Sequence, residues 1–153
     1  MNAAILTAVA TFAAVFCALW AAHSVGDHWI QTHHQACAKG APGWTGRIAC
    51  VKHVATLTGT KAAALAALVW VTGLHLNPLT VVVGLLVDAV SHYWADRRTT
   101  LARLAKTLRK SDFHQLGDGM VAPCGTGAYA LDQSWHHLWL FITALAIAAG
   151  GTG

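Results

Sequence analysis

Residues 3–22 read AAILTAVATFAAVFCALWAA, with Thr7 and Thr11 as the only polar side chains. The hydrocarbon core of a bilayer is about 30 Å thick, and a helix needs about 20 apolar residues to cross it. Threonine hydroxyls in such a helix can bond back to its own backbone. A cleaved signal peptide is the alternative, but the run lacks a basic leader and exceeds the usual apolar length of about 7–15 residues. We therefore predict a membrane span.

Three further apolar runs follow this one, at residues 62–76, 79–90 and 129–149. Asn77-Pro78 is expected to form a tight turn between two of them, because the residue before a proline avoids the helical region. The run at 62–76 is short, so its inner end is expected to extend back past Lys61, with the lysine side chain reaching the interface. The sequence thus predicts one all-α polytopic domain over residues 1–153, a four-helix transmembrane bundle with spans at about 3–28, 48–76, 79–95 and 128–149.

The composition favours the same class of protein. Of the 153 residues, 56% are hydrophobic and 10% are charged, whereas soluble domains carry about 25% charged residues. These values exclude a disordered chain and the ordinary surface of a soluble enzyme. The four cysteines do not indicate a disulfide framework, because the chain is neither short nor rich in loops.

The basic residues predict the orientation. All ten Lys and Arg fall between the first and second apolar runs or between the third and fourth. Loops rich in Lys and Arg stay on the cytoplasmic side, and these two loops share a side in a four-span protein. We therefore expect a multi-pass protein of the cell (inner) membrane with both termini outside.

Residues 97–110, in the third loop, are predicted to form an amphipathic helix along the inner leaflet. Leu101, Leu104, Ala105 and Leu108 recur at helical spacing, and cations occupy the other face. Such helices bind anionic lipid surfaces. The residues expected to contact lipid headgroups are Arg97, Arg98, Arg103, Lys106, Arg109 and Lys110. Membrane lipids are thus the expected partners; nucleic acid is a weaker alternative, and a homo-oligomer is left open.

Histidine and aspartate recur in pairs at the predicted helix ends. The pairs are His23/Asp27, Asp88/His92 and Asp132/His136, each spaced to share one helical face, and His53 precedes the second apolar run. In the predicted topology, all of them lie at cytoplasmic helix ends. Because a carboxylate within a span is costly, such residues face the bundle interior and find partners there. We expect them to converge in one cluster.

Imidazole and carboxylate are ordinary ligands of zinc and other divalent first-row metals. The predicted ligands are His23, Asp27, His53, Asp88, His92, Asp132 and His136, enough for one ion or two. Gln31, His34 and Gln133 are expected to orient these ligands from behind. The alternative is that each aspartate pairs with a protonated histidine and no metal binds.

A second cysteine-containing pattern competes for metal. His33 and Cys37, followed by Cys50 and His53, could close a tetrahedral zinc site. The ligand order is not that of a standard zinc finger, and the pattern shares His53 with the main cluster. A reducing cytoplasm disfavours a disulfide between the two cysteines.

The motifs also resemble those of a known family. Quoted in order, they are His23-x-x-Gly26-Asp27-x-x-x-Gln31, His53, Asp88-x-x-x-His92 and Leu131-Asp132-Gln133-x-x-His136. Together they are similar to a domain-of-unknown-function family of small polytopic membrane proteins from bacteria and phages, over most of the chain. The chain departs from that pattern at His28 and at Asp96-Arg97-Arg98. The resemblance implies a polytopic bundle with polar motifs at helix ends, and more distantly the chain is similar to membrane-bound metal-dependent hydrolases.

The favoured functional hypothesis is a metal-dependent membrane hydrolase that acts on a lipid or headgroup ester or phosphoester at the inner leaflet. Bound metal would activate water, and Asp27 or Asp132 would serve as the general base. The alternatives are a non-catalytic phage or bacterial membrane interaction protein, a proton or metal relay, and haem ligation by facing histidines.

Overall fold

The computed structural model describes residues 2–120 and 124–151, and in these residues every regular element is a helix. The described helices are α1 (Ala3–Val25), the π-helix η1 (Gly26–Ile30), α2 (His33–Ala38), α3 (Gly43–Thr72), α4 (Pro78–Asp96), α5 (Thr99–Thr107), α6 (Ser111–His114) and α7 (Gly127–Gly150). The all-α prediction is confirmed for these residues.

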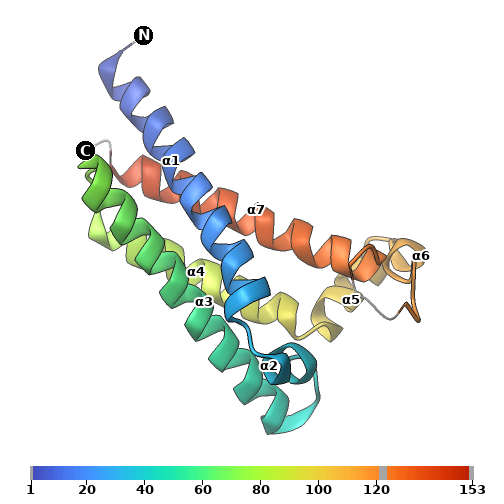
Figure 1. Cartoon of the computed structure of the whole chain (residues 1–153). Helices are drawn as coiled ribbons and strands as arrows, with labels where there is room; N and C mark the ends of the chain where they lie inside the picture. The colour runs from blue at the N-terminus through green and yellow to red at the C-terminus, as the bar shows by residue number, and fades with distance from the viewer. Residues whose placement is uncertain (1, 121–123, 152–153) are drawn as a thin grey trace.

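The four long helices pack side by side (Figure 1). Both α1 and α4 contact α3 on one side and α7 on the other, so the four helices surround a common interior. One half of that interior is an apolar core whose central members include Val15, Leu19, Leu65, Leu140 and Ile147.

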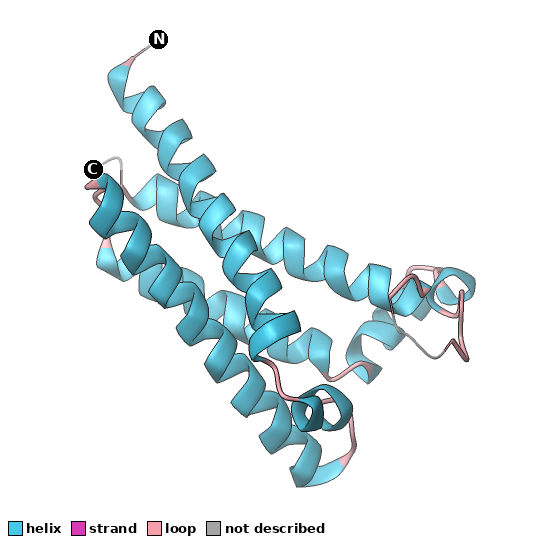
Figure 2. Ribbon diagram, viewed as in Figure 1, coloured by secondary structure: helices cyan, strands magenta, loops and turns pink. Residues whose placement is uncertain are grey.

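The two ends of the molecule differ in character. The two termini and the α3–α4 connection lie at one end, while α2, α5 and α6 lie at the other (Figures 1 and 2). The α3–α4 turn follows from local chemistry: Gly73 ends α3 with a φ of 68°, and the Asn77 side chain accepts from the Leu79 N–H before Pro78 starts α4. The two basic loops meet at the end away from this turn, where Arg97 and Arg98 donate to carbonyls of residues 36–41.

Three helical segments of the described chain are long and apolar enough to cross a membrane, namely Ala3–Ile30, Gly43–Thr72 and Pro78–Asp96. Helix α7 has 24 residues, but polar residues in its first half, Asp132 and Gln133 among them, keep it outside this set. The fourth span therefore remains a prediction.

The distribution of polar and apolar side chains is the reverse of that in a soluble protein. Trp70, Val71 and Val90 are 87%, 81% and 71% exposed, whereas Lys61 and Asp88 are 1% and 2% exposed. Apolar side chains on the outer face and ionisable ones inside are typical of helices that face lipid.

The helix predicted at residues 97–110 is shorter in the structure. Helix α5 covers Thr99–Thr107, and the left-handed φ of 57° at both Arg98 and Arg109 interrupts the helix on either side. Arg97 donates to the carbonyls of Lys39 and Ala41 at 2.6 Å each.

Arg98 similarly donates to the carbonyl of Ala36 at 3.0 Å. These two arginines therefore tie the α4–α5 corner to the segment around α2. Arg103, Lys106, Arg109 and Lys110 stay exposed and available to headgroups.

Candidate metal centre

A buried set of imidazoles occupies the half of the interior nearer α2 and α5. Each long helix contributes one histidine: His23 from α1, His53 from α3, His92 from α4 and His136 from α7. Their exposed fractions run from 0 to 2%. The rings of His92 and His136 stack at 3.9 Å between centroids, and the rings of His23 and His136 lie 5.2 Å apart.

Two carboxylates, Asp27 and Asp96, lie between these rings. Asp27 Oδ1 is 3.0 Å from His53 Nε2, and Asp96 Oδ2 is 3.2 Å from His92 Nε2. We call this set the His/Asp cluster; its members are His23, Asp27, His53, His92, Asp96 and His136. Two of its subsets, Asp27–His53–His92 and His92–Asp96–His136, could each hold a metal ion.

The end of α1 explains how Asp27 reaches the histidine of α3. The helix widens into the π-helix at Gly26–Ile30, a feature often found at functional sites. Gly26 is buried, and a Cβ there would clash with Leu57 Cδ1. The glycine of the His23-x-x-Gly26-Asp27 motif thus allows α1 to approach α3 closely.

The tightest part of the cluster has the dimensions of a metal site. The Nε2 atoms of His53 and His92 are 3.1 Å apart, and Asp96 Oδ2 lies 3.3 and 3.2 Å from them. Tetrahedral zinc with bonds of about 2.0–2.1 Å places its ligands about 3.3 Å apart. Asp27 Oδ1, at 3.0 Å from His53 Nε2 and 3.8 Å from His92 Nε2, is available as a fourth ligand.

Several polar atoms of the cluster are buried without a hydrogen-bond partner. Within the described residues these include both ring nitrogens of His23 and of His136 and the Nδ1 atoms of His53 and His92. A buried polar atom without a partner costs about 1–3 kcal/mol. The Nε2 atoms of the four histidines face the carboxylates, so a cation among them would give the unpartnered Nε2 atoms of His23 and His136 a common partner.

One cation of the chain already touches the cluster. Lys39, at the end of α2, places its Nζ 2.8 Å from Asp96 Oδ1, and its side chain is 12% exposed. One ammonium against the carboxylates of Asp27 and Asp96 leaves a buried excess of negative charge. A divalent ion would neutralise it, and so would protonation of a histidine.

The cluster meets solvent on its α7 side. Asp132 is the predicted ligand with the most exposed side chain, 24%, and its Oδ1 lies 3.4 Å from His136 Nε2. Gln133 Nε2 donates to Asp132 Oδ2 at 3.4 Å, so the glutamine orients this carboxylate rather than a cluster histidine.

The structure does not bring the remaining predicted residues into the cluster. Asp88 pairs with Lys61 at 2.5 Å, one turn further into the bundle, so the expectation that Lys61 reaches the interface is wrong. The Asp88 carboxylate offsets part of the cost of burying this ammonium between the helices. Gln31 is half-buried and its N–H closes the π-helix, and His34 is exposed on α2.

The competing cysteine pattern is dispersed as well. Cys37 Sγ contacts His33 Nε2 at 3.5 Å on the exposed side of α2. Cys50 is buried and donates to the Tyr93 carbonyl, and His53 belongs to the His/Asp cluster. These four residues therefore occupy three different places.

Asp96 is the cluster residue that the sequence reasoning missed. The signal was present, because His92 and Asp96 have the same four-residue spacing as His23 and Asp27. Asp88 is equally spaced from His92 on the other side, and the sequence does not say which of two such aspartates faces the histidines.

The Asp88–Lys61 pair yields a prediction. Asp88→Asn should lower the free energy of unfolding by about 3–5 kcal/mol, because it leaves a buried ammonium without its partner. The metal content should not change, since Asp88 lies outside the cluster. Thermal melting and elemental analysis in detergent measure both quantities. Recovery of stability in the Lys61→Met/Asp88→Leu double variant is the control, and loss of metal from Asp88→Asn would contradict this placement.

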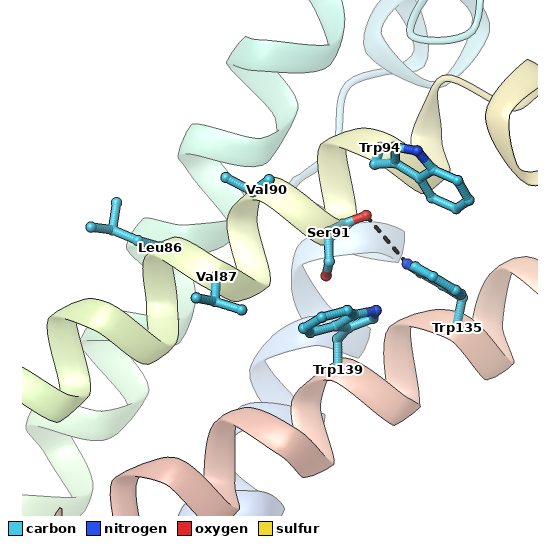
Figure 3. A pocket seen from close by; sticks show the side chains of 7 residues that line it. All are labelled: Leu86, Val87, Val90, Ser91, Trp94, Trp135 and Trp139. Carbon is cyan, nitrogen blue, oxygen red and sulfur yellow. Dashed lines mark hydrogen bonds between the residues drawn. The ribbon is translucent and has the colours of Figure 1, made fainter.

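An apolar groove lies beside the cluster, on the outer face between α4 and α7 (Figure 3). It has a volume of about 440 Å³, and its lining residues are Leu86, Val87, Val90, Ser91, Trp94, Trp135 and Trp139. Trp135 Nε1 donates to the Ser91 carbonyl at 3.3 Å. Ser91 and Trp135 directly precede His92 and His136 in the chain, so the groove and the cluster lie on neighbouring faces of the same helix turns.

Comparison with known proteins leaves the geometry as the sole guide to function. No protein-family model matches the chain, and no similar curated protein or solved structure was found.

Proposed function

We propose that the protein is a membrane-embedded, metal-dependent hydrolase whose substrate is a lipid ester or phosphoester. The observation that carries the proposal is the His53–His92–Asp96 triangle, whose edges of 3.1–3.3 Å match those of a tetrahedral metal site. A bound divalent metal would lower the pKa of a water ligand and polarise the bond to be cleaved.

In this proposal α7 is the fourth span, and the basic end of the molecule faces the cytoplasm with both termini outside. Trp44 and Trp70 are 75% and 87% exposed near the two ends of α3. At about 1.5 Å per residue they are about 39 Å apart along the helix. Tryptophans at that separation fit the two interfaces of a bilayer, and His53 then lies within its inner half.

The residues around the cluster have distinct roles in the proposed reaction. Asp132 is the general base, because its carboxylate combines exposure to solvent with contact to His136. Asp27 serves as a ligand, since its oxygens face His53 and His23. Asp132 takes the proton of the attacking water and returns it to the leaving group.

The groove and the basic helix support a lipid as the substrate. The groove between α4 and α7 accepts an acyl chain at the depth of the cluster. A second apolar hollow, between α5 and α7, shares Trp135 with it and includes Lys110 in its lining. The exposed cations of α5 and its flank, Arg103 and Lys106 among them, would attract an anionic headgroup.

The experiment is turnover in proteoliposomes. We expect zinc- or manganese-loaded protein to release fatty acid or a phosphorylated headgroup from phosphatidylglycerol faster than from phosphatidylcholine, as measured by mass spectrometry. A chelator should abolish the release and added metal should restore it. Metal-loaded protein that hydrolyses neither lipid would contradict the proposal and favour a non-catalytic role.

A relay across the membrane receives less support from the structure. The polar column runs from the cluster to the Lys61–Asp88 pair, but beyond that pair the interior is closed by the apolar core around Leu65 and Leu140. Metal or proton flux into liposomes at a rate matching turnover would reverse this preference.

A further inference from the structure

If one ion binds at the His53–His92–Asp96 triangle, two histidines of the His/Asp cluster remain without an ion. His23 and His136 take no part in the His53–His92–Asp96 triangle. Both are buried to 2% exposure or less, and their Nε2 atoms have no hydrogen-bond partner among the described residues. Most buried side-chain polar atoms have a hydrogen-bond partner, and a bound ion is one explanation for those that have none.

Each cluster carboxylate turns one oxygen toward each set. Asp27 directs Oδ1 to His53 Nε2 at 3.0 Å and Oδ2 to His23 Nε2 at 3.5 Å. Asp96 directs Oδ2 to His92 Nε2 at 3.2 Å and Oδ1 to His136 Nε2 at 3.8 Å. The two aspartates therefore lie between two pairs of histidines, as bridging carboxylates do.

The spacing of the rings also fits two ions. His92 and His136 are nearly parallel, with an interplanar angle of 19° and centroids 3.9 Å apart. Ions in two-metal hydrolytic sites lie about 3.5–4 Å apart. Stacked rings at this distance can present their Nε2 atoms to two neighbouring positions.

We infer that the cluster is a dinuclear site for divalent first-row transition metals, bridged by Asp27 and Asp96. His53 and His92 hold the first ion. His23 and His136 hold the second, and Asp132, whose Oδ1 lies 3.4 Å from His136 Nε2, keeps the role of general base beside it. The inference rests on the metal centre of the proposed function and adds a second ion to it.

Lys39 is compatible with the second ion. Its Nζ lies 2.8 Å from Asp96 Oδ1, the oxygen that faces His136. A carboxylate oxygen has two lone pairs, so Oδ1 can accept from the ammonium and coordinate an ion at once. Lys39 also offsets part of the negative charge of the site when the second ion is absent.

The test is metal stoichiometry in detergent-purified full-length protein loaded with manganese and then dialysed. We expect two ions per chain in the wild type and one in His23→Ala and His136→Ala. The matched control is His137→Ala, whose ring lies 6.1 Å from that of His23 and touches neither aspartate by any contact described; it should keep two ions. One ion per chain in the wild type at saturation, unchanged in His136→Ala, would overturn the inference.

Paramagnetic resonance of the same samples supplies a readout that a purely structural role would not alter. Two manganese ions bridged by carboxylates are exchange-coupled, so the wild type should lack the six-line signal of isolated bound manganese. His136→Ala should show that six-line signal. A wild-type spectrum identical to that of His136→Ala would count against a second ion even if the variant were partly unfolded.

The outcomes separate this inference from the proposed function. A protein that binds one ion and hydrolyses lipid would contradict the second ion alone. A protein that binds two ions and hydrolyses no lipid would contradict the enzyme alone.

Discussion

His92→Ala is expected to weaken the binding of zinc by at least about 100-fold. Removal of groups that merely orient a ligand already costs about 10–100-fold in affinity, and His92 Nε2 lies within 3.8 Å of His53, Asp27 and Asp96. No neighbouring side chain can replace it, because His53 and His136 already face the same carboxylates.

Competition with a chromogenic chelator in detergent measures this affinity. His75→Ala is the matched control, since His75 is exposed in the α3–α4 connection and should bind metal as the wild type does. Wild-type affinity in a folded His92→Ala protein would show that the imidazoles of the cluster do not hold the ion.

Asp132→Asn is expected to lower kcat for lipid hydrolysis by about 10²–10⁴-fold, the range for loss of a general base. The amide retains the shape of the side chain and can still accept from Gln133, so folding should be preserved. Affinity for the first ion should also be preserved, because His53, His92 and Asp96 are untouched.

The measurement is the rate of product release at saturating lipid, with metal content determined on the same sample. Asp118→Asn serves as the control, since Asp118 is exposed in the loop before α7 and should be neutral. Unchanged kcat in metal-loaded Asp132→Asn would assign the base elsewhere, Asp27 being the remaining carboxylate of the two predicted for this role.

The helical architecture was largely predictable because it follows from short-range patterns. The apolar run at 3–22 and the Asn77-Pro78 turn placed α1 and the start of α4 within a few residues. Helix α3 begins at Gly43 rather than near residue 48, because its first turns carry polar residues that a search for apolar runs passes over.

The parts that the sequence did not predict depend on which side of a helix faces its neighbours. The four-residue spacing around His92 allowed either Asp88 or Asp96 as its partner. Packing against α3 selects Asp96, because Asp88 pairs with Lys61 of that helix. Along α3, Lys61 contacts Asp88, and His53, about two turns nearer the start of the helix, contacts Asp96. The π-helix at Gly26–Ile30 and the close approach of Gly26 to Leu57 have no signal in hydropathy, since hydropathy does not report how one helix packs on another.

The contacts of the basic residues in 97–110 were likewise only partly predictable from the sequence. Charge patterning predicted six residues facing lipid headgroups, yet Arg97 and Arg98 bind backbone carbonyls around α2 instead. Arginine satisfies several acceptors at once, so its charge alone does not distinguish a lipid contact from a tie between loops.

X-ray absorption at the zinc K-edge of the loaded protein tests the metal centre most directly. The proposed site predicts nitrogen and oxygen neighbours at about 2.0–2.1 Å, with the outer-shell scattering of imidazole and no sulfur. A sulfur shell at about 2.3 Å would instead place the ion on cysteine, and an ion surrounded by water oxygens alone would show that the histidines and aspartates of the four helices do not bind it.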